Sequence, residues 1–143
     1  MNKELEKDFV YHFIVKEKRE RLLYELSGKK RMDGISRFCH NAEDLIRQDT
    51  IIRSGDDLFP EEILRISEQY TDRKQAYLIA FQEELDRMTC DVQTALDLVL
   101  GNGMAAVILL DTVVIIETEQ CNGTPYRYLL YRKKSLPKDA SGV

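Results

Sequence analysis

The sequence predicts an α+β fold in which a helical N-terminal half packs on one face of a small, mostly antiparallel four-stranded sheet. Two observations lead to this expectation. The first third of the 143 residues is rich in good helix formers, and short apolar runs suited to strands are confined to residues 77–132. Helical and strand-like segments do not alternate regularly, which argues against a doubly wound parallel sheet. The predicted order is α-α-α-β-α-β-β-β.

The first predicted helix covers residues 4–27, where apolar positions keep approximate helical spacing. It ends at Gly28, a residue favoured just beyond helix C-termini. Within it, residues 9–15 are apolar on almost every side, so a short strand is the alternative there. We favour a helix because no proline or glycine interrupts this segment.

Two more helices are expected before the first strand. One runs over residues 33–47 with Asp33 as its N-cap, and its apolar residues form one stripe. After a loop at residues 54–57, the next helix begins at Pro60, since proline is favoured at the first helical position.

The C-terminal half is expected to contain four strands and one helix. The helix is the clearest in the chain, because its apolar residues recur at helical spacing and a Gly-Asn-Gly segment follows it. Residues 1–132 are expected to form a single domain and residues 133–143 a flexible tail. The predicted strands are residues 77–81, 105–110, 113–119 and 126–132, and the helix is residues 89–100.

The predicted core joins this helix to the sheet, and one strand bears on self-association. Residues 77–81 carry no charge, so if they form an edge strand they must be covered. Residues 9–15 are the expected cover, from the same chain or from a second copy, and we favour a homodimer. The expected core residues are Leu78, Val92, Leu96, Val99, Val107, Leu109 and Ile115.

Composition favours a soluble cytoplasmic protein. No apolar stretch approaches the roughly 20 residues needed to cross a bilayer, and the N-terminus lacks the pattern of a secretory signal. Three widely spaced cysteines argue against a disulfide framework. A net charge of −4 argues against a nucleic-acid binder. The acidic charge is concentrated in residues 49–100, which form either a solvated face or an interaction surface.

The first candidate for chemistry is the pair Glu117 and Glu119. Because side chains alternate along a strand, the two would project from one face about 7 Å apart. Paired carboxylates at that distance can act as general acid and base. The alternative is a solvent-facing strand whose charges prevent edge-to-edge aggregation, and we favour it.

The other candidates are His40 and Cys121. A Cys–His dyad could join Cys121 to His40 or to His12. His40 also lies one helical turn from Glu43 and Asp44, a spacing that can hold a metal. Neither pattern is complete, so we favour ordinary structural roles and expect no metal and no cofactor. The basic residues 29–31 could bind a phosphate or an acidic partner, but a role at a helix end is the better explanation. Residues 31–44 form a distinctive pattern to which no function can be attached.

We therefore expect a non-catalytic protein–protein interaction module with a protein partner, by analogy with inhibitors or immunity proteins that mask a basic site. The alternative is a small carboxylate-based or metal-assisted hydrolase or nuclease. A pocket containing Glu117 and Glu119 would favour the enzyme, and a flat exposed edge would argue against it.

Overall fold

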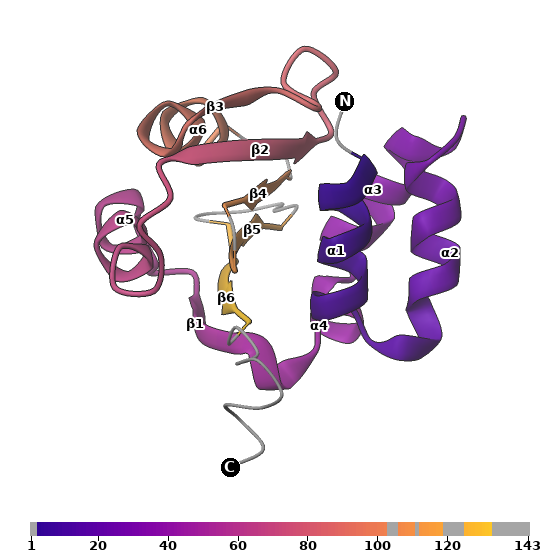
Figure 1. Ribbon diagram of the computed structural model, residues 1–143, viewed down its shortest axis with the longest axis horizontal. Helices are drawn as coiled ribbons and strands as arrows, with labels where there is room; N and C mark the ends of the chain where they lie inside the picture. Colours follow the sequence, from indigo (N-terminus) through magenta and orange to yellow (C-terminus); the bar gives the residue numbers. More distant parts are fainter. Residues whose placement is uncertain (1–2, 103–105, 111, 119–124, 133–143) are drawn as a thin grey trace, which may run out of the picture.

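The computed structural model describes residues 3–102, 106–110, 112–118 and 125–132, and these form one sheet with helices on both faces (Figure 1). None of the helices described is long and apolar enough to cross a membrane. In chain order the elements are α1 (Lys3–Phe13), α2 (Lys16–Leu26), α3 (Arg31–His40), α4 (Ala42–Leu45), the 3₁₀ turn η1 (Gln48–Thr50), β1 (Ile51–Gly55), α5 (Pro60–Ser67), β2 (Gln75–Ala80), β3 (Thr89–Asp91), α6 (Val92–Val99), β4 (Ala106–Leu109), β5 (Val113–Glu117) and β6 (Arg127–Tyr131).

The sheet has six strands in the order β1-β6-β5-β4-β2-β3, and all neighbours are antiparallel. The α+β class is confirmed, but the expectation of four strands is wrong. The two strands missed lie at the edges. β1 ends in Arg-Ser-Gly and shows no alternation of buried and exposed residues. β3 has only three residues and runs directly into α6, so its sequence had been assigned to that helix.

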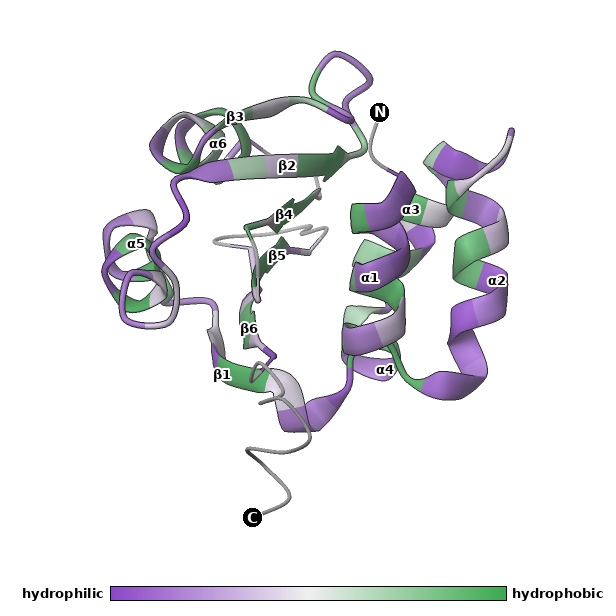
Figure 2. Ribbon diagram, viewed as in Figure 1, coloured by the Kyte–Doolittle hydropathy of each residue, from purple (hydrophilic) through white to green (hydrophobic). Residues whose placement is uncertain are grey.

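The helices cover both faces of the sheet rather than one. Tyr77 and Ile79 of β2 contact the layer of α1 to α4, whereas Leu78 contacts the layer of α5 and α6. Figure 2 shows the apolar residues along the central strands that both layers bury. Both faces are covered because β2 and β5 consist largely of consecutive apolar residues, which place apolar side chains on each face of the sheet.

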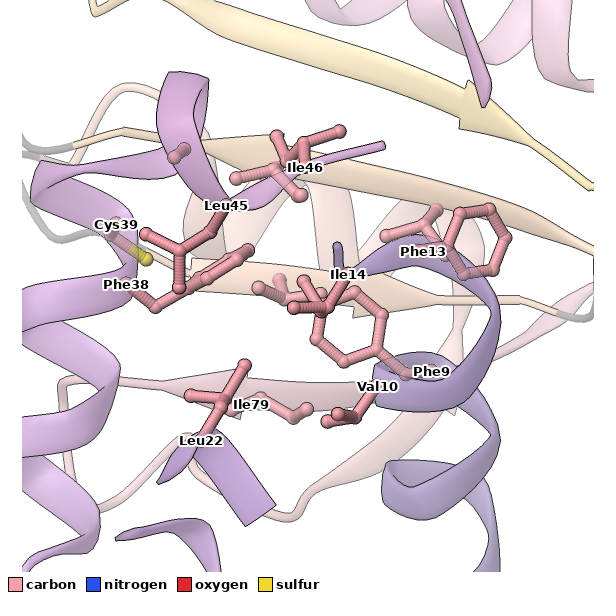
Figure 3. Close-up of a cluster of buried hydrophobic side chains, with 14 of the residues drawn as sticks. Phe9, Val10, Phe13, Ile14, Leu22, Phe38, Cys39, Leu45, Ile46 and Ile79 are labelled. Atoms are coloured by element: carbon pink, nitrogen blue, oxygen red, sulfur yellow. The ribbon is translucent and has the colours of Figure 1, made fainter. Parts of the chain in front are cut away.

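The predicted single helix at residues 4–27 is interrupted. α1 ends at Phe13, Ile14 forms an antiparallel bridge with Ile46, and the backbone N–H of Val15 donates to the Leu45 carbonyl at 2.9 Å. Figure 3 shows Phe9, Val10, Phe13 and Ile14 of this segment in the core beside side chains of α3 and β2. Tertiary pairing therefore ends the helix where the local sequence contains no breaker.

The predicted core is divided between the two faces. Leu78, Leu96 and Ile115 are buried under α5 and α6, but Val107 is buried on the opposite face. The side chain of Leu109 lies outside the described part of the chain. Asp91 caps α6 by accepting a hydrogen bond from the Thr94 backbone N–H.

The position of β2 bears on self-association. β2 pairs with β4 on one side and β3 on the other, so residues 77–81 are not an edge strand. α1 covers this strand within its own chain. The argument from an uncovered edge strand therefore no longer supports a homodimer. The homodimer stays a prediction, which a solution mass above the 16.7 kDa of one chain would support.

Candidate functional site

The structure buries Glu117 instead of exposing it. Its side chain is 1% accessible, and its Oε1 accepts hydrogen bonds from the Gly101 backbone N–H at 3.0 Å and from Arg127 Nε at 2.9 Å. Arg127 Nη1 in turn donates to the Leu58 carbonyl at 2.9 Å. The expectation of a solvent-facing Glu117 is therefore wrong. This ion pair joins β5 and β6 to the end of α6 and to the segment before α5.

One oxygen of Glu117 remains without a partner. Oε2 is buried and accepts no hydrogen bond from any residue in the described ranges. Burial raises the pKa of the Glu117 carboxyl, and this effect outweighs the opposing hydrogen bonds from Gly101 and Arg127. The carboxyl also has almost no contact with solvent.

The remaining sequence candidates do not assemble around Glu117. Glu119 and Cys121 lie outside the described residues. His40 is exposed at the last position of α3. Within the described ranges, no group of three or more His, Cys, Asp or Glu residues is placed to hold a metal ion, so His40, Glu43 and Asp44 form no such group.

A second buried charge cluster, which sequence reasoning missed, surrounds Arg31 at the first position of α3. Its Nη1 and Nη2 each donate to one Glu6 oxygen at 2.7 Å. Its Nε and Nη2 donate to the two Asp86 oxygens at 2.6 and 2.9 Å, and Nη1 also reaches the Leu26 carbonyl at 2.9 Å. A guanidinium has five N–H donors, so every donor is used.

The carboxylates around Arg31 are held from their other sides as well. The Tyr77 hydroxyl donates to Glu6 Oε2 at 2.6 Å, and the Ala80 backbone N–H donates to Asp86 Oδ1 at 3.0 Å. Although burial lowers the pKa of the Arg31 guanidinium, its hydrogen bonds to Asp86 and Glu6 raise it overall. Arg31 is therefore a fixed cation that ties α1, α3, β2 and the β2–β3 loop together.

A cavity of about 490 Å³ opens beside this cluster. It is lined by the N-terminal end of α1, the C-terminal end of α2 and the β2–β3 loop. These three segments are in the upper part of Figure 1. Arg31 contacts two lining residues directly and holds Asp86, the neighbour of a third. The lining residues are Lys3, Glu6, Lys7, Leu23, Tyr24, Leu26, Ser27 and Arg87.

The cavity has apolar walls and a cationic rim. Leu23, Tyr24 and Leu26 of α2 supply the apolar surface. The exposed residues Lys3, Lys7 and Arg87 supply positive charge from two separate walls. Among the described residues of the lining, Glu6 is the single acidic one, and its charge is already opposed by Arg31.

Arg87 is held in an unusual backbone conformation. Its φ of 68° makes it the one non-glycine residue with a positive φ in the described ranges. Its N–H donates to the Leu78 carbonyl at 2.7 Å, which fixes it at the end of the β2–β3 hairpin. L-residues other than glycine adopt this conformation rarely, so a cation is placed on the rim at a cost in backbone energy.

The structure also explains the distinctive residues 31–44. Gly34 allows α2 and α3 to approach closely, since a Cβ there would lie 2.6 Å from the Glu25 Cβ. Arg37 forms an ion pair with Glu25, and Phe38 is part of the core. Arg31 does contact the end of α2, as the role at a helix end implied, because it donates to the Leu26 carbonyl. It is also buried and paired with Glu6 and Asp86, which the sequence did not predict. Residues 31–44 therefore form the contact between α2 and α3 and supply Arg31 to the charge cluster beside the cavity.

The partners of Arg31 could not be read from the sequence, because Glu6 and Asp86 lie 25 and 55 residues away from it. A search of protein-family models, of curated proteins and of solved structures finds no match to this chain.

Proposed function

We propose that this chain is a non-catalytic protein-interaction module whose partner docks at the cavity between α1 and α2. The role would be that of an inhibitor- or immunity-like protein, which acts by occupying a surface of its partner. The observation that carries the proposal is the 490 Å³ cavity with apolar walls and a cationic rim. Pockets with apolar linings and a few placed polar groups are the usual form of a binding site.

The charged groups beside the cavity favour binding over catalysis. A general acid or base needs a free position from which to exchange a proton with a substrate. All donors of Arg31 are used, and both oxygens of Glu6 accept hydrogen bonds. This arrangement supports a rigid floor for recognition rather than a reactive centre.

The exposed residues at the opening favour a protein as the partner. Tyr24 lines the cavity and is 69% accessible, so its ring is available to a docking surface. Tyrosine and arginine are enriched at protein interfaces, and both occur at this opening.

The test is selection from a random peptide library displayed on phage. The full chain is compared with Ser27→Trp, which places a large ring at the cavity, and with Gln69→Trp, a matched change of an exposed polar residue just after α5. We expect peptides that are enriched on the wild type and on Gln69→Trp and are lost on Ser27→Trp. Failure to enrich any peptide, or equal enrichment on all three proteins, would contradict the proposal.

One observation favours the alternative of a carboxylate-based hydrolase or nuclease. Glu117 has a raised pKa and an unpartnered oxygen, properties found in catalytic acids. It is ranked second because the side chain is 1% accessible and paired with Arg127. Hydrolysis of nitrophenyl ester and phosphodiester substrates by the wild type, lost in Glu117→Gln, would reverse this ranking.

A further inference from the structure

We propose that the segment of the partner bound in the cavity carries an apolar side chain with carboxylates on both sides of it. This inference rests on the proposed protein-binding function and specifies the chemistry of the occupant. The overall acidic composition led us to expect a basic partner site, and the local charge of the cavity reverses that expectation.

The apolar element of the occupant follows from the α2 wall. Leu23 and Leu26 line the cavity from the last turn of α2, and the exposed Tyr24 lines it as well. A leucine or phenylalanine side chain placed there would lose its contact with water. Burial of such a side chain is the usual source of affinity at the centre of an interface.

The acidic elements follow from the positions of the cations. Lys3 and Lys7 are one helical turn apart on α1, a rise of about 6 Å. Arg87 belongs to a different wall, the β2–β3 loop. Cations on two walls are matched by carboxylates at two places along an occupant. A single carboxylate, such as that of a fatty acid, would be matched on one wall only.

Two acids close to the rim cations in sequence, Glu6 and Asp86, have other partners. Glu6, between Lys3 and Lys7 in sequence, accepts hydrogen bonds from Arg31 and Tyr77. Asp86, the residue before Arg87, is paired with Arg31 and with the Ala80 backbone. The buried guanidinium thus binds both carboxylates and leaves the charge of the rim available to a partner.

The backbone of Arg87 is a further observation that points to the rim. Strained backbone conformations persist where the surrounding structure holds them, and they concentrate at binding sites. The hydrogen bonds of Asp86 and of the Arg87 N–H supply that support. Glycine would adopt this backbone conformation more easily, yet the chain has an arginine here, whose long side chain lines the cavity.

The test uses a fluorescein-labelled peptide with a central leucine between two glutamates on each side. Control peptides replace the glutamates by glutamine or the leucine by glycine, and binding to the full chain is followed by anisotropy. We expect the acidic leucine peptide to bind at least about tenfold more tightly than either control, with affinity falling as salt is added.

Protein variants place this binding at the rim. Lys7→Glu and Arg87→Gln should each weaken binding by about fivefold or more, whereas the exposed controls Lys18→Glu and Arg65→Gln should leave it unchanged. Equal weakening by the controls would mean that net charge alone attracts the peptide, and it would overturn the inference.

Two outcomes separate this inference from the proposed function. If the phage library yields cavity-dependent peptides without acidic residues, or the neutral leucine peptide binds as tightly, the protein-binding function stands and the acidic occupant is wrong. If no displayed or synthetic peptide depends on the cavity, both fail. Binding of dodecanoate at the cavity with no binding of the acidic peptide would identify a lipid-like anion as the occupant and overturn both.

Discussion

Two buried arginines, Arg31 and Arg127, hold opposite faces of the same sheet, and they are satisfied to different degrees. Arg31 faces two carboxylates and a carbonyl, and all the oxygens of Glu6 and Asp86 accept hydrogen bonds. Arg127 faces the Leu58 carbonyl and the single carboxylate of Glu117, one oxygen of which has no partner among the described residues. Both side chains are almost completely buried.

This difference in hydrogen bonding indicates which of the two clusters is the more rigid. A buried polar network with all its members satisfied rigidifies its surroundings, whereas one with an unpartnered atom carries an uncompensated desolvation cost. The satisfied network lies beside the cavity, and the incompletely satisfied one lies on the face opposite it. We infer that the cavity is bounded by the more rigid of the two clusters, as a preformed binding site requires.

Arg31→Met should have the largest effect on stability. Removal of the guanidinium leaves Glu6 and Asp86 buried with no counter-ion, and breaking a buried ion pair in this way costs about 3–5 kcal/mol. Arg127→Met should cost less, because the Glu117 carboxyl that remains is already inclined to bind a proton. Urea unfolding of both variants measures the two losses. A smaller loss for Arg31→Met than for Arg127→Met would contradict the comparison.

The two carboxylates can be compared directly by amide substitution. Glu6→Gln places an NH₂ group against donors from Arg31 or Tyr77, so we expect a loss of about 2 kcal/mol. Glu117→Gln can keep its carbonyl oxygen toward Gly101 and Arg127 and place the NH₂ where no partner is lost, so we expect a change below about 1 kcal/mol. Thermal and urea unfolding should give the same order. Equal losses would show that the unpartnered oxygen has no energetic consequence.

The same oxygen predicts a dependence of stability on pH. The pKa of Glu117 is raised in the folded state above its ordinary value of 4.5, so the folded protein binds this proton more tightly than the unfolded chain. The contribution of Glu117 to folding is therefore fully present below pH 4.5 and is lost as the pH rises through the folded pKa.

Urea unfolding across this range compares the wild type with Glu117→Gln, which cannot titrate. The stability of the wild type relative to the variant should fall as the pH rises. A difference that grows with pH would mean that Arg127 lowers the pKa of Glu117 in the folded state, and a constant difference would mean that folding leaves this pKa unchanged.

Sequence reasoning succeeded where a local pattern decides the structure. The apolar spacing that predicted α6, the proline that predicted the start of α5 and the apolar runs of β2, β4, β5 and β6 are all properties of neighbouring residues. It failed at β1 and β3, which are short, and at the break after Phe13, because their pairing partners are distant.

The candidate site was mostly beyond reach for the same reason. From the sequence alone, Arg31 and Glu117 are expected at the surface, because a charged side chain is usually exposed and is buried only when it has a partner. The partner of Arg31 in the β2–β3 loop is 55 residues away in sequence. The residues that line the cavity likewise belong to three segments that no local pattern connects.

The smallest expected effect concerns Arg87, where stability and binding should change in opposite directions. Glycine tolerates a positive φ, so Arg87→Gly should stabilise the fold by about 1 kcal/mol through relief of the backbone conformation. The same change removes a rim cation and should weaken binding of the acidic leucine peptide. Arg87→Ala is the matched control, because it removes the side chain but keeps the Cβ that makes this conformation costly. We expect Arg87→Ala to weaken peptide binding as much as Arg87→Gly does. Urea unfolding should show no gain in the stability of Arg87→Ala. If the Arg87→Ala and Arg87→Gly variants were equally stable, the backbone strain at Arg87 would be too small to indicate a function. The argument for a binding site at the rim would then rest on the charge of its residues alone.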